Sequence, residues 1–191
     1  MLIGLTGVFG SGKTTIAKLF AKHGYKYISA DEIGHKLFNK NEIKNRVIQK
    51  FGKSILIKSK IDRKKLKKIV FNNHKKLIEL NKIVHPPIIN EIKSIIKKNK
   101  NKKIIVEGAL LIEAGCKCLF DKMIVVKINP KEQLKRVLKK KKYTKQEIKS
   151  ILKSQLSQKE KLKYADFVIS NSKALELTRK EVEKIIALLG S

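Results

Sequence analysis

The 191-residue sequence has no tryptophan, only 6% aromatic residues and only two cysteines. Those cysteines, Cys116 and Cys118, are separated by one residue and have no histidine nearby. Such a spacing matches neither a disulfide framework nor a zinc site. We therefore expect two reduced, structural thiols, as in proteins of the cytosol.

Long hydrophobic runs are also missing. The longest stretch without a formally charged side chain covers residues 1–12 and is interrupted by glycine. A helix that crosses a bilayer needs about 20 apolar residues, so we expect no membrane span. The N-terminus lacks the basic leader and the small-residue cleavage site of a secretory signal. The sequence therefore predicts a soluble cytoplasmic protein.

Acidic residues are scarce: 16 Asp and Glu stand against 46 Lys and Arg, which gives a formal net charge of +30. An excess of this size suggests nucleic-acid binding. Only four of the basic residues are arginine, however, and proteins that read bases or clamp phosphates favour the bidentate arginine fork. Lysine is also accompanied by abundant isoleucine and asparagine, three residues with A- and T-rich codons, so we attribute much of the charge to genome composition. Neither nucleic acid nor a membrane is expected as a partner.

Hydrophobic residues make up 42% of the chain, which is enough for a buried core. Five short runs are rich in Ile and Val and mostly lack polar alternation: Leu2–Thr6, Tyr25–Ser29, Ile104–Glu107, Met123–Ile128 and Phe167–Ser170. This pattern is typical of strands buried on both faces of a parallel sheet. The segments between these runs have apolar residues at helical spacing. We therefore expect a three-layer α/β fold with about five parallel strands.

The region from about 32 to 100 is longer than one crossover needs, and its apolar spacing is helical throughout. We expect an inserted helical subdomain there, with Asp62 as a helix N-cap. Residues 85–87, His-Pro-Pro, predict a break between two helices. Further along, Thr144 and Glu147 have the spacing of a capping box.

A phosphate-binding motif follows the first expected strand. Residues 7–14, GVFGSGKT, fit G-x-x-x-x-G-K-[ST] in full. Glycines allow backbone N–H groups to surround a phosphate, and the start of the next helix adds its dipole. In this motif the Lys13 ammonium interacts with the negative charge of the β- and γ-phosphates, and the Thr14 hydroxyl is a ligand for Mg²⁺. No Asn-Lys-x-Asp run for guanine recognition occurs, so a kinase is favoured over a GTPase.

Two carboxylates end expected strands. Asp31 lies at the edge where ligands bind in open α/β sheets, and it could orient an acceptor hydroxyl. Alternatively, Asp31 is the N-cap of a helix that begins at Glu32. Glu107 could act on Mg²⁺ through water, or it could be an ordinary carboxylate at a strand end.

Several motifs together resemble the dephospho-CoA kinase family. They are Gly4–Thr15, Ala30–Ile33, Asp62-Arg63 with Val70-Phe71, Leu80-Asn81 with His85-Pro86, Leu110–Glu113, Gln133–Arg136, Gln155 and Ala165–Asn171. The matches run nearly from end to end in the order of the family. The resemblance implies a P-loop kinase that transfers the γ-phosphate of ATP to the ribose 3′-hydroxyl of dephospho-CoA, with Mg²⁺ as cofactor.

The resemblance also implies the organisation of the chain and its site. Residues 1–191 would be a single P-loop kinase domain, with a helical acceptor-binding insert at about 32–100 and a helical lid at about 136–160. The residues expected to contact ATP are Val8, Phe9, Gly10, Ser11, Gly12, Lys13, Thr14, Thr15 and Arg136. Asp31 would be the general base, Lys13 and Arg136 would also be catalytic, and Arg63 and His85 would face the acceptor.

Two departures from the family pattern limit this transfer. The family commonly has Asp-Ala-Asp where residues 29–31 read Ser-Ala-Asp, and the usual second lid arginine is replaced by Lys140. Residues 139–142 are all lysine and also fit a solvated charge run.

Two alternatives stay open: another small-molecule kinase of the same fold, such as one acting on a nucleoside monophosphate, and a nucleic-acid-binding module with a vestigial loop. The oligomeric state is not predicted.

Overall fold

The computed structural model describes residues 1–71 and 73–190. Two compact units make up the chain: one combines Met1–Ser29 with Asn99–Ser191, and the other is Ala30–Lys98. Among the described residues, no helix is long and apolar enough to cross a membrane.

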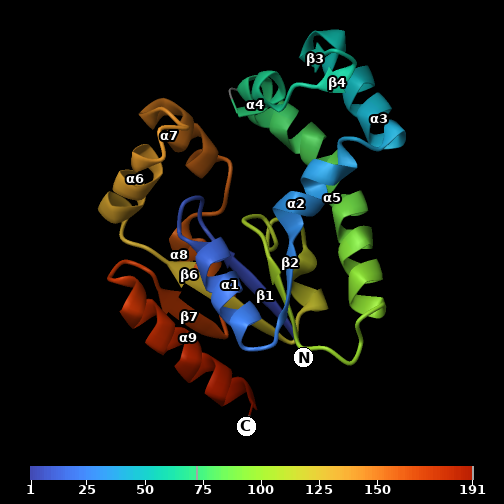
Figure 1. The fold of residues 1–191 in the computed structure, drawn as a ribbon. Coiled ribbons are helices and arrows are strands. Elements are labelled where there is room, and N and C mark those ends of the chain that lie inside the picture. Colours follow the sequence, from blue (N-terminus) through green and yellow to red (C-terminus); the bar gives the residue numbers. More distant parts are fainter. Residues whose placement is uncertain (72, 191) are drawn as a thin grey trace. The chain divides into compact units, whose positions relative to one another are not determined.

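A five-stranded parallel sheet forms the centre of the first unit, with strand order β2-β5-β1-β6-β7 (Figure 1). The strands are β1 (Leu2–Gly7), β2 (Lys26–Ser29), β5 (Ile104–Glu107), β6 (Lys122–Lys127) and β7 (Phe167–Ser170). The sequence prediction of an α/β fold with five parallel strands is confirmed, and the strand bounds differ from the expected runs by at most one residue.

Burial explains why these runs form strands. Ile3, Leu5, Ile105, Ile124 and Val126 have no exposed surface. Helices α1 (Lys13–Lys22) and α9 (Leu175–Gly190) contribute to the same apolar cluster and lie side by side in Figure 1. A strand covered by neighbours and by helices has no solvent-facing side that would select polar residues.

Three further helices of this unit follow β6 and carry clear N-terminal caps. They are α6 (Pro130–Lys139), α7 (Lys145–Lys153) and α8 (Gln158–Leu162), and the short 3₁₀ helix η2 (Cys116–Leu119) precedes β6. The predicted capping box of Thr144 and Glu147 is confirmed at the start of α7. Both cysteines are free thiols, with Cys116 buried and Cys118 exposed.

The second unit has a small core of its own. It consists of α2 (Ala30–Leu37), α3 (Asn41–Phe51), η1 (Lys53–Ile55), β3 (Leu56–Ile57), β4 (Lys60–Ile61), α4 (Arg63–Phe71) and α5 (His74–Lys97). Buried residues from α3, η1, α4 and α5 form the core: Ile43, Val47, Ile55, Leu66, Val70, Leu77, Leu80 and Val84. Asp62 caps α4 as predicted, because its Oδ1 accepts the N–H of Lys64 at 2.8 Å.

The expectation that this region is entirely helical is wrong. Strands β3 and β4 pair antiparallel, and Lys58 and Ser59 between them both have positive φ, 45° and 61°. Two consecutive residues in this conformation produce the tight turn of a two-residue hairpin. The turn contains no glycine or asparagine, so the usual sequence signal for it is missing.

The predicted helix break at residues 85–87 is also wrong, because α5 continues through Pro86 and Pro87. A proline inside a helix removes one backbone hydrogen bond, and its ring crowds the preceding turn. Packing on both sides compensates: Val84 is 9% exposed and Ile92 is fully buried. The helix is therefore stabilised by its buried face despite its unfavourable local sequence.

Candidate functional site

The phosphate-binding motif forms a compact loop between β1 and α1. Its Ser11 N–H donates to the Val8 carbonyl at 3.1 Å, and α1 begins at Lys13. The Lys13 side chain is 7% exposed, and its Nζ donates to the Val8 carbonyl at 3.2 Å. The lysine therefore folds back over the loop, in the same unit as all the residues expected to bind ATP.

Two glycines of the loop are required by both conformation and space. Gly10 and Gly12 have φ values of 77° and 91°, which L side chains rarely adopt. A Cβ on Gly10 would overlap the Val137 side chain of α6, and a Cβ on Gly12 would overlap the Asn171 side chain amide. Segments distant in sequence therefore pack directly against the loop backbone.

Asn171, the residue after β7, binds the phosphate loop through its side chain. Its side chain is buried, its Nδ2 donates to the Ser11 carbonyl at 2.8 Å, and its Oδ1 accepts the Thr178 hydroxyl at 3.1 Å. Asn171 ends one of the family motifs in the sequence, but no role was predicted for it. A buried asparagine needs several hydrogen-bond partners, and the loop carbonyl is one of them.

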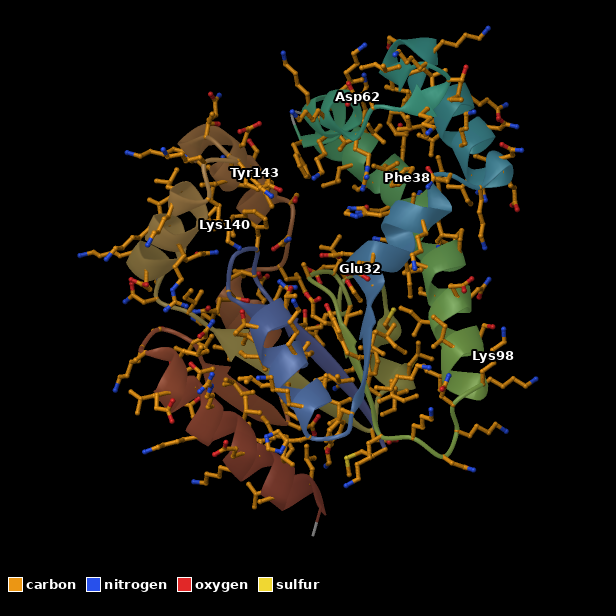
Figure 2. The ribbon with its side chains drawn as sticks, in the orientation of Figure 1. Glu32, Phe38, Asp62, Lys98, Lys140 and Tyr143 are labelled. Atoms are coloured by element: carbon orange, nitrogen blue, oxygen red, sulfur yellow. The ribbon has the colours of Figure 1, made fainter. Side chains whose placement is uncertain are left out.

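Phe9 contacts three residues outside the loop. Its N–H donates to Gln155 Oε1 at 3.0 Å, and its carbonyl accepts Gln133 Nε2. Its ring meets Tyr143 edge-on with centroids 5.1 Å apart. Tyr143, labelled in Figure 2, lies between α6 and α7, so the three partners come from three different segments.

The Arg136 guanidinium is bound by protein groups. It pairs with Glu132 at 2.8 Å and donates to the carbonyls of Asn171 at 2.8 Å and Lys173 at 3.3 Å. These contacts hold α6 against the segment that follows β7. Lys140, where the family usually has a second arginine, ends α6 and is exposed (Figure 2).

The predicted Mg²⁺ ligands are both oxygen donors. Thr14 lies exposed in the first turn of α1, whereas Glu107 is 3% exposed at the end of β5 and accepts the Tyr27 hydroxyl at 3.0 Å. No cluster of three acidic, histidine or cysteine ligands occurs in the described part of the chain. Mg²⁺ in kinase sites usually has one or two protein oxygens besides phosphate and water, so a hydroxyl and a nearby carboxylate suit it.

The residues expected on the acceptor side all lie in the second unit. Asp31 belongs to the first turn of α2, which begins at Ala30, so the alternative that it caps a helix starting at Glu32 is wrong. Arg63 begins α4, and half-buried His85 lies within α5.

His35, for which no role was predicted, interacts electrostatically with two of these residues, Asp31 and Arg63. Burial lowers the pKa of His35, and the Arg63 charge lowers it further, whereas the Asp31 carboxylate acts in the opposite direction. Asp31 and His35 are four residues apart on α2, and this i,i+4 spacing was the signal in the sequence. Asp31 and Arg63 therefore both influence the protonation of His35.

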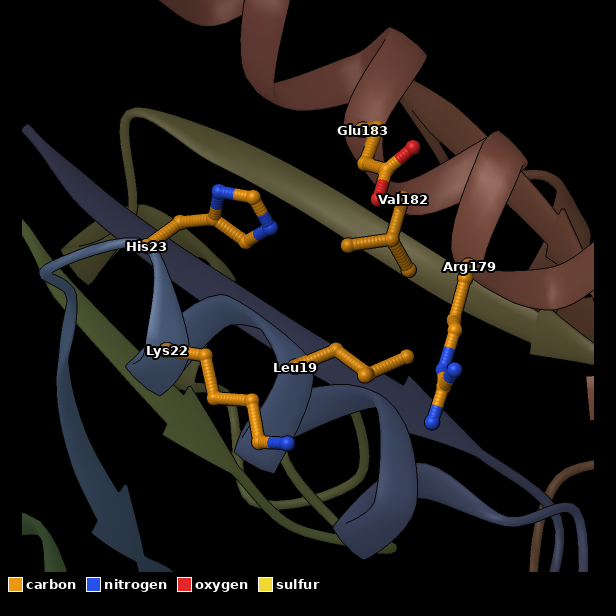
Figure 3. A pocket seen from close by; sticks show the side chains of 6 residues that line it. All are labelled: Leu19, Lys22, His23, Arg179, Val182 and Glu183. Atoms are coloured by element: carbon orange, nitrogen blue, oxygen red, sulfur yellow. The ribbon is translucent and has the colours of Figure 1, made fainter. Parts of the chain in front are cut away.

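A pocket of about 230 Å³ lies between α1 and α9 (Figure 3). Its lining residues are Leu19, Lys22, His23, Arg179, Val182 and Glu183. Lys22 ends α1, whereas the phosphate loop precedes the start of that helix. The pocket is therefore at the opposite end of α1 from the loop, and its described lining includes none of the predicted site residues.

Comparison with known proteins identifies the family of the chain. The family model for dephospho-CoA kinase matches residues 1–176. The dephospho-CoA kinase of Fusobacterium nucleatum is 43% identical over 185 residues, with 96% of each chain covered. That of Aquifex aeolicus is 39% identical over 186 residues, with 96% of this chain and 94% of the relative covered.

Solved structures lead to the same family. The dephospho-CoA kinase of Campylobacter jejuni superposes with a TM-score of 0.70 and 34% identity, covering 98% of this chain and 96% of that one. A shikimate kinase from Acinetobacter baumannii, 18% identical with a TM-score of 0.57 and 98% and 92% coverage, shares the fold alone. With the phosphate loop intact and relatives matched along almost the whole length, the chain belongs to the dephospho-CoA kinase family, whose activity is to phosphorylate dephospho-CoA with ATP to make coenzyme A.

Proposed function

We propose that this chain transfers the γ-phosphate of ATP specifically to the ribose 3′-hydroxyl of dephospho-CoA, which gives coenzyme A and ADP. The observation that carries the proposal is the complete phosphate loop, with Lys13 folded over it, in a chain of this family. We place the reaction in the cytoplasm.

The loop and α1 would bind the triphosphate. Backbone N–H groups of the loop, other than those of Phe9 and Ser11 that are bonded within the protein, would bind the phosphate oxygens together with the positive end of α1. Lys13 would exchange its bond to the Val8 carbonyl for the β- and γ-phosphates. Phosphoryl transfer passes through a loose transition state, so its rate enhancement comes mainly from positioning and charge stabilisation, to which Lys13 would contribute.

Thr14 would hold Mg²⁺ directly, and Glu107 would hold it through water. When bound, Mg²⁺ would neutralise negative charge on the phosphates of ATP. Burial of Glu107 and its hydrogen bond from Tyr27 limit the movement of the carboxylate.

On the acceptor side, Asp31 would act as the general base. Its carboxylate accepts the proton of the 3′-hydroxyl while that oxygen bonds to the γ-phosphorus. The bond between the γ-phosphorus and the bridging oxygen breaks, and ADP leaves with both electrons of that bond. Arg63 and His85 would bind the anionic acceptor, with the insert at about 32–100 as the acceptor-binding region.

The segment at about 136–160 would form a lid over ATP. A closed lid excludes water, which would otherwise hydrolyse the nucleotide. Arg136 uses three of its five N–H donors on Glu132, Asn171 and Lys173, and we expect the remaining donors to contact ATP.

A coupled assay of ADP formation tests the proposal. Purified protein with ATP, Mg²⁺ and dephospho-CoA should form ADP well above a control without acceptor. No increase over that control contradicts the proposal. If AMP is a better acceptor than dephospho-CoA, the nucleoside monophosphate alternative is correct instead.

A further inference from the structure

Two glutamine side chains, which the proposed reaction does not use, hold the phosphate loop at Phe9. Gln155 Oε1 accepts the Phe9 N–H at 3.0 Å, and Gln133 Nε2 donates to the Phe9 carbonyl. Gln133 is 6% exposed, and Gln155 is partly buried. Both polar groups of one loop residue are therefore bound by side chains from α6 and from the segment after α7.

These two bonds orient two consecutive peptide groups. The Phe9 N–H belongs to the peptide that joins Val8 and Phe9, and the Phe9 carbonyl belongs to the peptide that joins Phe9 and Gly10. Because a trans peptide is planar, its C=O and N–H point in opposite directions, and no described peptide bond is cis. Gln133 therefore turns the Gly10 N–H away from α6, and this N–H is one of the loop donors expected to meet phosphate.

The glutamine after α7 is itself held in place. The next residue, Leu156, donates its N–H to Glu113 Oε1 at 2.9 Å. Glu113 in turn pairs with Lys161 of α8, whose Nζ lies 2.6 Å and 2.9 Å from the two carboxylate oxygens. Lys161 Nζ also donates to the Ala109 carbonyl at 2.8 Å, and the residue is fully buried.

This arrangement satisfies every hydrogen-bonding group of the lysine. An ammonium group has three donors, and Lys161 has three acceptor atoms within 3 Å. A fully bonded buried ion pair permits few alternative positions of its partners. The Glu113–Lys161 pair thus fixes the backbone from which the Gln155 side chain reaches Phe9.

We propose that Gln133 and Gln155 are positioning residues for phosphoryl transfer: they orient the peptides around Phe9 so that the loop is preorganised for the phosphates of ATP. The inference rests on the proposed function. It assigns the glutamines no contact with the reacting atoms. We expect their effect on nucleotide affinity, because both glutamines act on the loop backbone, which binds the phosphates of ATP before the reaction begins.

Gln155→Met is the informative variant, because it keeps the length of the side chain but removes the acceptor. Loss of one such hydrogen bond should raise the KM for ATP about three- to tenfold. Since uniform binding is lost, kcat and the KM for dephospho-CoA should stay within about twofold of wild type. Gln133→Met should have the same signature. Lys184→Met, an exposed position on α9 outside the proposed lid and insert, is the control and should behave as wild type.

Calorimetric titration with Mg·ADP separates this inference from the proposed function, because it needs no acceptor. Weaker binding by Gln155→Met and Gln133→Met, with normal binding by Lys184→Met, supports the inference even if wild type fails to phosphorylate dephospho-CoA. A double variant should lose less affinity than the two single losses combined, since both side chains act on Phe9. Wild-type nucleotide affinity in Gln155→Met overturns the inference. A fall in kcat with unchanged KM for ATP also overturns it, because this result indicates an interaction made only in the transition state or a loss of folded protein.

Discussion

Single residues on α2 carry the acceptor-side chemistry of the proposal. Asp31 lies in the first turn of α2. Arg63 and Lys67 both act on His35, which follows Asp31 by one helical turn. The proposal requires the Asp31 carboxylate to accept the proton of the 3′-hydroxyl.

Replacement of Asp31 by Asn should lower kcat about 10²- to 10⁴-fold, the usual contribution of a general base. The KM for ATP should change far less, because Asp31 lies in the second unit, which we propose binds the acceptor. Steady-state kinetics with each substrate varied in turn measures both effects. Glu32→Gln, the adjacent acid on α2, is the matched control and should keep a near-normal kcat. An equal loss of ATP affinity in Asp31→Asn would instead assign the residue to the nucleotide or metal site.

His35 predicts a pH dependence of stability. Burial and the Arg63 and Lys67 charges hold the pKa of His35 below its ordinary value, against the opposing Asp31 and Glu32 charges. Between the folded-state pKa and the ordinary value, the unfolded chain binds more protons, so stability rises with pH. The free energy of unfolding should therefore fall as the pH drops through this window.

Urea unfolding at pH 7.5 and at pH 5.5 measures this effect. The difference in unfolding free energy between the two pH values should be smaller in His35→Gln than in wild type. The control, His23→Gln, keeps His35 and should show the wild-type difference. Equal differences in all three proteins would mean that His35 does not contribute.

At the scale of elements, α8 is anchored through one ion pair. Lys161→Met leaves the Glu113 carboxylate, which is only 17% exposed, without its cation. Leaving a buried charge unpaired costs about 3 kcal/mol of stability. The double variant Lys161→Met, Glu113→Gln removes the charge and should recover part of that loss in urea unfolding. Lys159→Met, an exposed position on the same helix, should cost less than about 0.5 kcal/mol. No recovery in the double variant would show that packing, and not the unpaired charge, causes the loss.

Elements also show where local sequence patterns are insufficient. The capping box at Thr144 and the cap at Asp62 were predictable, because each involves residues within three positions. The uninterrupted α5 was not predictable, because burial of Val84 and Ile92 outweighs the local effect of Pro86 and Pro87. The β3–β4 turn was also not predictable. Lys58 and Ser59 have positive φ, a conformation that neither residue type favours.

For the whole molecule, the net charge of +30 has two opposite consequences. Like charges repel within the folded protein, and the same field attracts the polyanionic substrates of the proposed reaction. Raising the salt concentration from about 10 mM to about 150 mM shortens the Debye length from about 30 Å to about 8 Å, which weakens both effects.

The melting temperature should therefore rise by about 2 to 4 °C over this salt range, equivalent to about 1 kcal/mol in a chain of this size. The KM for ATP should rise about threefold or more over the same range. Calorimetry and steady-state assays in KCl measure both quantities, with an uncharged osmolyte as control. A melting temperature that falls with KCl would show that attractive ion pairs outweigh the repulsion.

The sequence by itself determined the parallel α/β fold, the phosphate loop and its Lys13, because buried strands and a contiguous loop leave short, periodic patterns in the chain. Only the tertiary structure decided what surrounds that loop. Gln133, Gln155 and Asn171 contact it from 124, 146 and 160 residues away, and Arg136 bonds to the carbonyls after β7. Such contacts depend on how the sheet and the helices pack together, and packing between distant segments leaves no fixed spacing in a sequence.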